Sequence, residues 1–530
     1  MEPLSDRPWL KGWPSEVPAS IEYPKEPLHW LLTRSARLFG DRAALIYEGS
    51  TYTFKELLDK AARVASSLTK LGVVKGSKVA LFMLNSPDFV VCYYASLMAG
   101  ATVVPLNPML RAREATYMLE DAEVEVAIVD EETWSQLKGS AWRGKVIVAG
   151  EARPGGLSLE TLATEGGLPP SVEIDPINDV AVIQYTAGTT AEPKGVMLTH
   201  FNLLSNAIAI AKVCLLREGE VQLGGLPLYH SYGMTNVMNA SLYAGATVAL
   251  MRRFDLEEAL RTIERYKVNV WFGVPTMFIA TVNHLRRCPH DLSSLRFCNS
   301  GGGPIAVSVI EEFEKVTGTL LMQGYGLTEA SPVTHSNVPL KKYIKPGSVG
   351  RPLPDTEAMI VDLETGRGPL PPGSVGELVV KGPQVMKGYW KRPKETSEAL
   401  RDGWLYTGDV AWMDEDGYFY VIDRKKDVIK CKGYSISPRE LEDVLYQHPA
   451  VKECAVIGKP DPVAGEVPKA FVVLKEGYSV AHDELIKFVE ERVAPYKRLR
   501  EVEFRESLPK SHVGKVLRRL LREEELRRAR

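Results

Sequence analysis

Short apolar runs alternate with helical patterns along most of this 530-residue chain, and this alternation constrains its fold more than any other feature. Apolar runs suited to strands occur at 78–83, 124–129 and 268–272, and apolar residues recur at helical spacing over 54–71. Strands that alternate with helices are typical of an α/β architecture. The sequence therefore predicts an α/β protein.

Two ten-residue segments resemble each other and indicate an internal repeat. Leu97–Leu106 reads LMAGATVVPL, and Leu242–Met251 reads LYAGATVALM. In each, we expect an apolar helix to end at a glycine in the C′ position, before a β-branched strand. The segments predict two related α/β halves with a ligand in the crevice between them.

A change of composition and charge marks the predicted domain boundary, which lies between residues 425 and 426. Before it, the chain becomes turn-rich and strand-like; after it, the charge changes sign. Residues 424–530 carry 24 Lys and Arg against 18 Asp and Glu, whereas the rest of the chain carries 41 against 49. We expect a large N-terminal domain over 1–425, with a β-rich subdomain at its end, and a small α+β domain over 426–530. The basic domain could face nucleic acid, and a phosphorylated small molecule fits equally well.

Cysteine usage and hydropathy indicate a cytoplasmic protein. The six cysteines are scattered without a C-x-x-C pair, which is typical of free thiols in a reducing compartment. The first residues show no signal-peptide pattern. Glycine and proline interrupt the most apolar window, residues 89–110, so we expect a buried helix, a turn and a strand there rather than a membrane span.

A segment suited to binding phosphate groups follows the apolar run at 180–183. Residues 185–196 read YTAGTTAEPKGV and combine threonines, glycines and a lysine. Small residues let backbone N–H groups approach an oxyanion, and hydroxyls add donors. A Walker A loop is excluded because Pro193 and Gly195 stand where its second glycine and Mg²⁺-binding hydroxyl would be. Taken alone, the segment is better explained as a surface turn.

Four further segments place reactive side chains beside turns: 226–233 (LPLYHSYG), 323–329 (QGYGLTE), 404–409 (WLYTGD) and 508–515 (LPKSHVGK). Tyr325 could stack on a purine, Glu329 could hold a hard cation such as Mg²⁺, and Asp409 suits ribose hydroxyls. Taken singly, His230 is more typical of a buried core histidine, and Lys515 of a solvated lysine.

In order and spacing, these five segments resemble the core motifs of the adenylate-forming superfamily, which includes acyl-CoA synthetases, peptide-synthetase adenylation domains and beetle luciferases. The similarity spans about residues 30–520. The resemblance implies ATP as a substrate, Mg²⁺ as a cofactor and coenzyme A as a co-substrate. It also implies a small C-terminal domain that moves between two reaction steps.

The resemblance also assigns nucleotide contacts to the matching residues. The loop 186–194 would hold the β- and γ-phosphates, while Tyr325 and the segment 301–304 would enclose the adenine. Asp409, helped by Arg424, would hold the ribose. The implied ATP and AMP contacts are Thr186, Gly188, Thr189, Thr190, Lys194, Gly302, Gly303, Gln323, Gly324, Tyr325, Gly326, Thr328, Asp409, Arg424 and Lys515.

Further roles follow from the same resemblance. The implied catalytic residues are Lys515, His230, Thr328 and Glu329, and the implied Mg²⁺ ligands are Thr186 and Glu329. Lys426 matches the hinge about which the small domain moves. Lys430, Lys432, Gly433 and Tyr434 match the face of that domain that enters the site for the thioester step. Our own expectation for the acyl pocket, based on apolar character, is Tyr232, Val274, Thr276, Met277 and Ser300.

Two alanines depart from the family pattern in the phosphate segment. Ala187 replaces a common hydroxyl, and the loss of one donor costs about 0.5–1.5 kcal/mol. Ala191 replaces the usual glycine and costs about 1 kcal/mol if the position requires a positive φ. We therefore expect weakened ATP binding with the site retained.

The predicted function is an acyl-CoA synthetase that adenylates a medium- or long-chain fatty acid and transfers the acyl group to coenzyme A. The pattern IEYPKEP at 21–27, with no carrier domain after Arg530, resembles stand-alone fatty-acyl-CoA ligases. An aryl-acid CoA ligase shares every motif used here and stays an alternative, as does a non-catalytic acyl- or nucleotide-binding relative. We expect no nucleic-acid partner; the oligomeric state is not specified by the sequence, and a homodimer stays open.

Overall fold

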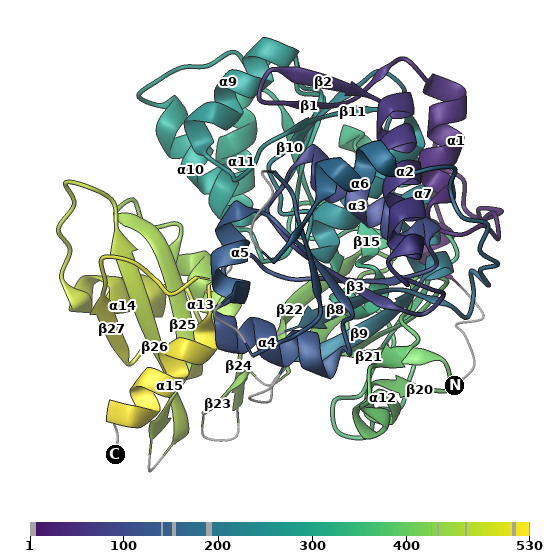
Figure 1. Ribbon diagram of the computed structural model, residues 1–530. Coiled ribbons are helices and arrows are strands. Elements are labelled where there is room, and N and C mark those ends of the chain that lie inside the picture. The colour runs from purple at the N-terminus through teal and green to yellow at the C-terminus, as the bar shows by residue number, and fades with distance from the viewer. Residues whose placement is uncertain are drawn as a thin grey trace.

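The computed structural model describes residues 7–138, 141–150, 155–186, 193–425, 427–431, 434–461, 464–510 and 516–528, with the backbone alone at residues 434 and 435. A large α/β body is followed by a smaller α+β part, shown in yellow tones in Figure 1. Within these ranges, no helix has both the length and the apolar character needed to cross a membrane.

The first sheet has eight strands and contains the predicted phosphate segment. Its strands are β3 (Lys78–Phe82), β4 (Thr102–Pro105), β5 (Val126–Val129), β6 (Lys145–Val148), β7 (Leu157–Ser158), β8 (Val180–Thr186), β9 (Lys194–Thr199) and β19 (Gly388–Tyr389). They lie in the order β19-β9-β8-β4-β3-β5-β6-β7. The strands from β8 through β4 and β3 to β7 pair in parallel, whereas β8, β9 and β19 pair antiparallel.

The second sheet has nine strands and carries most of the other predicted site residues. Its strands are β1 (Ala43–Tyr47), β2 (Ser50–Thr53), β10 (Val221–Gly224), β11 (Thr247–Leu250), β12 (Val270–Gly273), β13 (Phe297–Ser300), β14 (Leu320–Gly326), β15 (Val333–Ser336) and β16 (Arg351–Pro352). They lie in the order β16-β15-β14-β13-β12-β10-β11-β1-β2. The strands β10 to β14 pair in parallel, so the segments after β12, β13 and β14 leave the sheet at one edge.

Helices pack between and around these two sheets; most of them share one apolar core with the sheets, whereas the helices over 112–121 and 131–138 belong to a second apolar cluster. The helices of this body are α1 (Trp30–Phe39), α2 (Phe54–Lys70), α3 (Pro87–Met98), α4 (Ala112–Asp121), α5 (Glu131–Lys138), α6 (Leu159–Glu165), α7 (His200–Val213), α8 (Ala240–Ala244), α9 (Leu256–Tyr266), α10 (Pro275–Leu285), α11 (Val307–Thr317) and α12 (Pro393–Ala399), with the short helices η1 (Pro8–Leu10), η2 (Gly233–Asn239), η3 (Thr328–Ala330) and η4 (Lys341–Tyr343). Local signals fix their ends: a capping box of Thr53 and Glu56 starts α2, and Ser86 caps α3 before Pro87.

The predicted internal repeat is present in the backbone. Gly100 follows the end of α3 at φ +77°, and Gly245 follows α8 at φ +74°; both are in the left-handed region that favours glycine. Each glycine leads directly into a strand, β4 in one half and β11 in the other. The α/β fold predicted from the sequence is confirmed.

Two five-stranded sheets complete the chain. The first contains β17 (Glu357–Val361), β18 (Gly376–Lys381), β20 (Leu400–Arg401), β21 (Trp404–Met413) and β22 (Phe419–Arg424). The second contains β23 (Ile429–Cys431), β24 (Tyr434–Ile436), β25 (Val451–Asp461), β26 (Gly465–Leu474) and β27 (Glu501–Phe504), with α13 (Pro438–Leu445), α14 (His482–Glu490), η5 (Pro495–Lys497) and α15 (Arg518–Arg528). This last part has apolar clusters of its own. The boundary between 425 and 426 stays a prediction.

Candidate nucleotide and acyl site

The predicted phosphate segment joins the antiparallel strands β8 and β9. Thr186 pairs with Lys194, so the two strands hold both ends of the segment. The Tyr185 hydroxyl donates a hydrogen bond to Asp121 Oδ2 over 2.5 Å, which ties β8 to the end of α4. The residues between the paired ends that carry predictions lie outside the described residues, and their contacts stay predictions: Ala187, Gly188, Thr189, Thr190 and Ala191.

Tyr389 connects the lysine of this segment to the predicted metal carboxylate. Its hydroxyl donates a hydrogen bond to Glu329 Oε1 over 2.8 Å, and Lys194 Nζ lies over its ring, 5.5 Å from the centroid. Burial, and next the negative charge of Glu329, raises the pKa of Tyr389, so the hydroxyl stays protonated and donates. Lys194, Glu329 and Tyr389 form what we call the phosphate cluster.

A second group, which we call the nucleoside cluster, consists of Tyr325, Asp409 and Arg424. The Tyr325 hydroxyl donates to Asp409 Oδ2 over 2.5 Å, and Arg424 Nε lies 2.7 Å from Asp409 Oδ1. The antiparallel register of β21 and β22 places Asp409 directly opposite Arg424. Both carboxylate oxygens are therefore engaged, and the side chain of Asp409 is only 5% exposed.

The two clusters adjoin along the chain, because Tyr325 lies on β14 and Glu329 lies on η3, which follows directly after that strand. The charge of Asp409 is the main cause that raises the pKa of Arg424, and Glu329 of the phosphate cluster also contributes. Burial, followed by the charge of Asp409, raises the pKa of Tyr325, which keeps its hydroxyl protonated. A phosphate-side carboxylate thus lies within electrostatic range of the predicted ribose site.

The end of β14 leads from the nucleoside cluster to the predicted acyl site. Gln323, Gly324, Tyr325 and Gly326 lie on this strand, and Thr328 starts η3 directly after it. Thr328 Oγ1 lies 3.5 Å from Ser231 Oγ, beside the segment that carries His230. In that segment the Tyr232 N–H donates to His230 Nδ1 over 3.2 Å. The structure thus brings the motifs 226–233 and 323–329 together.

A glycine turn over residues 301–303 follows β13 and packs against the ring of Tyr232. A Cβ on Gly301 would lie 2.8 Å from Tyr232 Cζ, so a side chain at this position would meet the ring. Gly302 has φ +75°, and a Cβ there would lie 3.6 Å from Val274 Cγ1. The Tyr232 hydroxyl donates to the Asn299 carbonyl over 3.2 Å. Gly303 continues this turn, and the remaining residues of the predicted acyl pocket lie at the start of α10 and the end of β13: Thr276, Met277 and Ser300.

The predicted C-terminal residues are only partly described. Lys430 lies on β23, and its side chain is exposed. Cys431 pairs with Tyr434, and Lys510 pairs with Val516, so strand pairs enclose two of the predicted functional segments. Lys426, Lys432, Gly433 and Lys515 lie outside the described residues, and their roles stay predictions.

Sequence reasoning missed two side chains of the site. Tyr389 stands between Gly388 and Trp390 with no recognisable motif, and its position depends on the pairing of β19 with β9. Ser231 lies within residues 226–233, where the sequence pattern favoured His230 and Tyr232 instead. For Tyr389, the local sequence offered no signal.

Comparison with known proteins identifies the family. The sequence model of the AMP-binding enzyme family matches residues 32–390, and the model of the AMP-binding enzyme C-terminal domain matches residues 440–515. This chain belongs to the AMP-binding enzyme family. The predicted membership of the adenylate-forming superfamily is confirmed.

Three relatives show what this AMP-binding enzyme resembles. A long-chain-fatty-acid–CoA ligase of Bacillus subtilis is 43% identical, with 98% of each chain covered. A feruloyl-CoA synthase of Amycolatopsis sp is 39% identical, with 92% of this chain and 96% of that protein covered. The crystal structure of the anthranilate CoA ligase AuaEII in complex with anthranoyl-AMP is 29% identical, with a TM-score of 0.90 and coverage of 97% and 99%.

The donor set of this AMP-binding enzyme fits a magnesium nucleotide. Among the described residues, no group of three or more His, Cys, Asp or Glu could hold a metal ion. Mg²⁺ typically uses one or two protein carboxylates together with substrate phosphates and water, so the single carboxylate of Glu329 is enough to hold it. The amide nitrogen of Gln323 is buried without a hydrogen-bond partner in the described part of the chain, which leaves a donor for a ligand.

Proposed function

We propose that this AMP-binding enzyme is a fatty-acid–CoA ligase that activates a medium- or long-chain fatty acid with ATP and transfers the acyl group to coenzyme A. The observation that carries the proposal is that the phosphate and nucleoside clusters adjoin, which suits one nucleotide bound across both. The identity with the fatty-acid ligase of Bacillus subtilis over nearly the whole chain supports the choice of acid.

In the first step, a carboxylate oxygen of the acid attacks the α-phosphorus of ATP, and the bond from that phosphorus to the bridging oxygen breaks to release pyrophosphate. Two anions must meet, so catalysis consists mostly of alignment and charge neutralisation. Lys515 would bridge the acid and the α-phosphate, and Lys194 would balance charge on the leaving group. Mg²⁺, held by Glu329 and Thr186, would supply further neutralisation.

In the second step, the thiol of coenzyme A loses its proton and attacks the acyl carbon, and the bond to the phosphate oxygen of AMP breaks. We infer that the small domain turns about Lys426 and exchanges Lys515 for the loop around Gly433 between the steps. Lys515→Ala should then stop pyrophosphate release but leave thioester formation from supplied acyl-adenylate. The nearby Lys510→Ala should affect neither reaction, and equal loss of both in Lys515→Ala would refute the exchange.

Pyrophosphate release on mixing the protein with ATP, Mg²⁺ and a panel of acids tests the proposal directly. The panel should include decanoate, palmitate, benzoate and ferulate, and formation of AMP and acyl-CoA should follow when coenzyme A is added. We expect the highest kcat/KM with an alkyl acid. No release with any acid would instead favour a non-catalytic binding protein.

An aryl-acid CoA ligase is the second candidate. The feruloyl-CoA synthase relative favours it, as does the ring of Tyr232, which packs directly on the glycine turn beside the predicted acyl pocket and would suit a flat aromatic acid. A higher kcat/KM with ferulate or benzoate than with palmitate would establish this alternative and reject the fatty-acid assignment.

We further propose a cytoplasmic location, supported by six cysteines that are all free. Assembly into a homodimer is a separate proposal, and light scattering of the purified protein tests it. A mass equal to that of a single 58.7 kDa chain would reject the dimer.

A further inference from the structure

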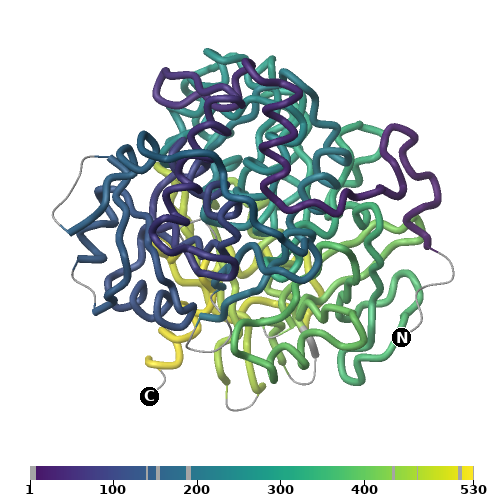
Figure 2. The backbone as a smooth tube through the Cα atoms, turned by 45° about the vertical axis from the view of Figure 1, so that its right-hand side comes forward, coloured from purple at the N-terminus to yellow at the C-terminus, as the bar shows by residue number. Residues whose placement is uncertain are grey.

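The N-terminal segment, residues 7–23, lies against β16 and the turn that follows it. The Ser20 hydroxyl donates to Asp355 Oδ1 over 2.6 Å, and the Ile21 N–H donates to Asp355 Oδ2 over 2.8 Å. Arg351 Nη1 donates to the Gly12 carbonyl over 3.0 Å. Figure 2 shows this purple segment running beside the green segments that follow residue 350. We call it the N-terminal strap.

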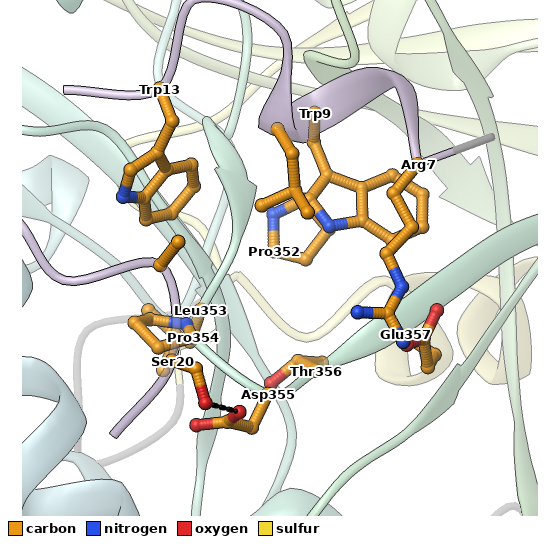
Figure 3. A pocket seen from close by; sticks show the side chains of 12 residues that line it. Arg7, Trp9, Trp13, Ser20, Pro352, Leu353, Pro354, Asp355, Thr356 and Glu357 are labelled. Carbon is orange, nitrogen blue, oxygen red and sulfur yellow. Dashed lines mark hydrogen bonds and ion pairs between the residues drawn. The ribbon is translucent and has the colours of Figure 1, made fainter.

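The strap carries two tryptophans whose environments differ. Both line a cavity of about 160 Å³ together with Pro352 and neighbouring residues, and Figure 3 shows their rings apart from each other. Trp9 is only 3% exposed, and its backbone packs so closely on Gly417 that a Cβ there would lie 2.3 Å from Trp9 Cα. Trp13 instead donates to the Val17 carbonyl within the strap over 2.7 Å.

From Trp9, a series of aromatic rings reaches the nucleoside cluster. The ring centroids of Trp9 and Phe419 lie 6.4 Å apart, those of Phe419 and His335 lie 4.6 Å apart, and those of His335 and Tyr325 lie 5.9 Å apart. His335 is opposite Tyr325 in the pairing of β14 with β15. Such tilted contacts fix the plane of each ring relative to the next.

His335 is suited to a purely steric role in this series. Its side chain is fully buried, and its Nε2 has no hydrogen-bond partner within the described residues. Nδ1 lies 2.9 Å from the Thr334 hydroxyl. Burial lowers the pKa of His335 to about 3, so the ring stays neutral at physiological pH. A neutral buried ring without a catalytic partner acts through contact with its neighbours.

We propose that His335 is a positioning residue for the nucleotide, and that through Phe419 and His335 the N-terminal strap fixes the ring plane of Tyr325 against the adenine. The inference rests on the proposed function, because it needs Tyr325 to contact the base. Residues at the start of the chain thereby set the affinity for ATP without touching it. Phe419 belongs to β22, the strand that also carries Arg424, so the strap supports two members of the nucleoside cluster.

The test compares His335→Leu with His335→Phe, and Trp9→Leu with Trp13→Leu. Binding of ATP with Mg²⁺ is measured by titration calorimetry, and KM values for ATP, acid and coenzyme A are measured separately. His335→Leu and Trp9→Leu should raise the Kd and KM for ATP about three- to tenfold. The KM for the acid and kcat at saturating ATP should stay within about twofold of the wild type.

The matched variants separate positioning from a loss of packing. His335→Phe keeps a ring in the series and should retain the wild-type Kd, while Trp13→Leu removes an indole outside the series and should also retain it. An unchanged Kd in His335→Leu would overturn the inference. A fall in kcat with unchanged KM for ATP would do the same, because it would indicate a general structural defect.

The melting temperature of each variant identifies any that fold poorly. If Trp9→Leu does not fold, the His335 pair still tests the positioning of Tyr325, because the Leu and Phe variants differ in whether a ring is retained. Wild-type protein that binds no ATP would overturn the proposed function together with this inference. Wild-type binding that His335→Leu leaves intact would overturn the inference alone.

Discussion

The nucleoside cluster and the phosphate cluster use similar side chains but are held in different ways. In the nucleoside cluster, Tyr325 and Arg424 bind Asp409 directly, so the three groups satisfy one another. In the phosphate cluster, Glu329 and Lys194 both contact Tyr389. The nucleoside cluster is therefore formed before the nucleotide binds. The phosphate cluster instead presents the Lys194 ammonium and the Glu329 carboxylate to the reacting phosphates. We therefore expect nucleoside-side changes to act on KM and phosphate-side changes to act on kcat.

The largest effect should come from Glu329→Gln. This change removes the charge of the predicted Mg²⁺ ligand but keeps its shape, and kcat for pyrophosphate release should fall by about 10²- to 10³-fold. The Mg²⁺ concentration for half-maximal rate should rise. Glu398→Gln, an exposed change of the same kind, serves as the control, and an unaltered Mg²⁺ dependence in Glu329→Gln would argue against the assignment.

Asp409→Asn should have the next largest effect, on the other side of the comparison. It removes the charge opposite Arg424 and an acceptor for the ribose, and hydrogen bonds of charged groups contribute about 1.5–3 kcal/mol. The KM for ATP should rise about 10- to 100-fold, with kcat at saturating ATP within about threefold. Asp414→Asn in the same hairpin is the control. A fall in kcat without a rise in the KM for ATP would contradict the expected difference between the two clusters.

Tyr389→Phe should produce a smaller loss of activity, and it separates the hydrogen bond of Tyr389 from its ring contact in the phosphate cluster. The variant keeps the ring under Lys194 and loses only the hydrogen bond to Glu329, so kcat should fall about five- to tenfold. Tyr389→Leu removes the ring as well and should lose more. Steady-state pyrophosphate assays measure both, and equal activities in the two variants would mean that the ring contact with Lys194 contributes nothing.

His335→Phe, beside the nucleoside cluster, should have the smallest effect on catalysis and should act on acid stability instead. The pKa of His335 is about 3 in the folded protein and about 6.5 in an unfolded chain. Below pH 6.5 the unfolded state therefore binds more protons, and stability falls with decreasing pH down to about pH 3. His335→Phe should remove up to about 1.4 kcal/mol of this loss for each pH unit in that window. Denaturant unfolding at pH 7 and pH 5 measures it, and equal pH dependence in both proteins would contradict the assignment.

Much of the fold followed from local patterns. The apolar run at 78–83 became β3, the helical pattern at 54–71 became α2, and the glycines of the repeat took the expected left-handed conformation. The family, the acid–thiol ligase activity and the use of ATP, Mg²⁺ and coenzyme A, all implied by the motifs, agree with the comparisons. The individual residue roles stay predictions.

What could not be predicted depends on contacts between distant segments. Tyr389 lies 60 residues from Glu329, and nothing in its neighbourhood indicates that its hydroxyl meets that carboxylate. Trp9 lies in a segment rich in tryptophan and proline, and it packs on Gly417, which is more than 400 residues away in sequence. Tertiary packing, which local periodicity does not encode, positions both side chains.

The pairing of Thr186 with Lys194 has a consequence for how such enzymes diverge. The ladder of β8 and β9 ends at this pair, so the hydrogen bonds that hold the sheet are made before the phosphate segment begins. We therefore expect exchanges such as alanine for a hydroxyl at 187, or for glycine at 191, to alter nucleotide affinity without removing any of those bonds. The pairing that holds the sheet and the affinity for the nucleotide are therefore expected to vary separately.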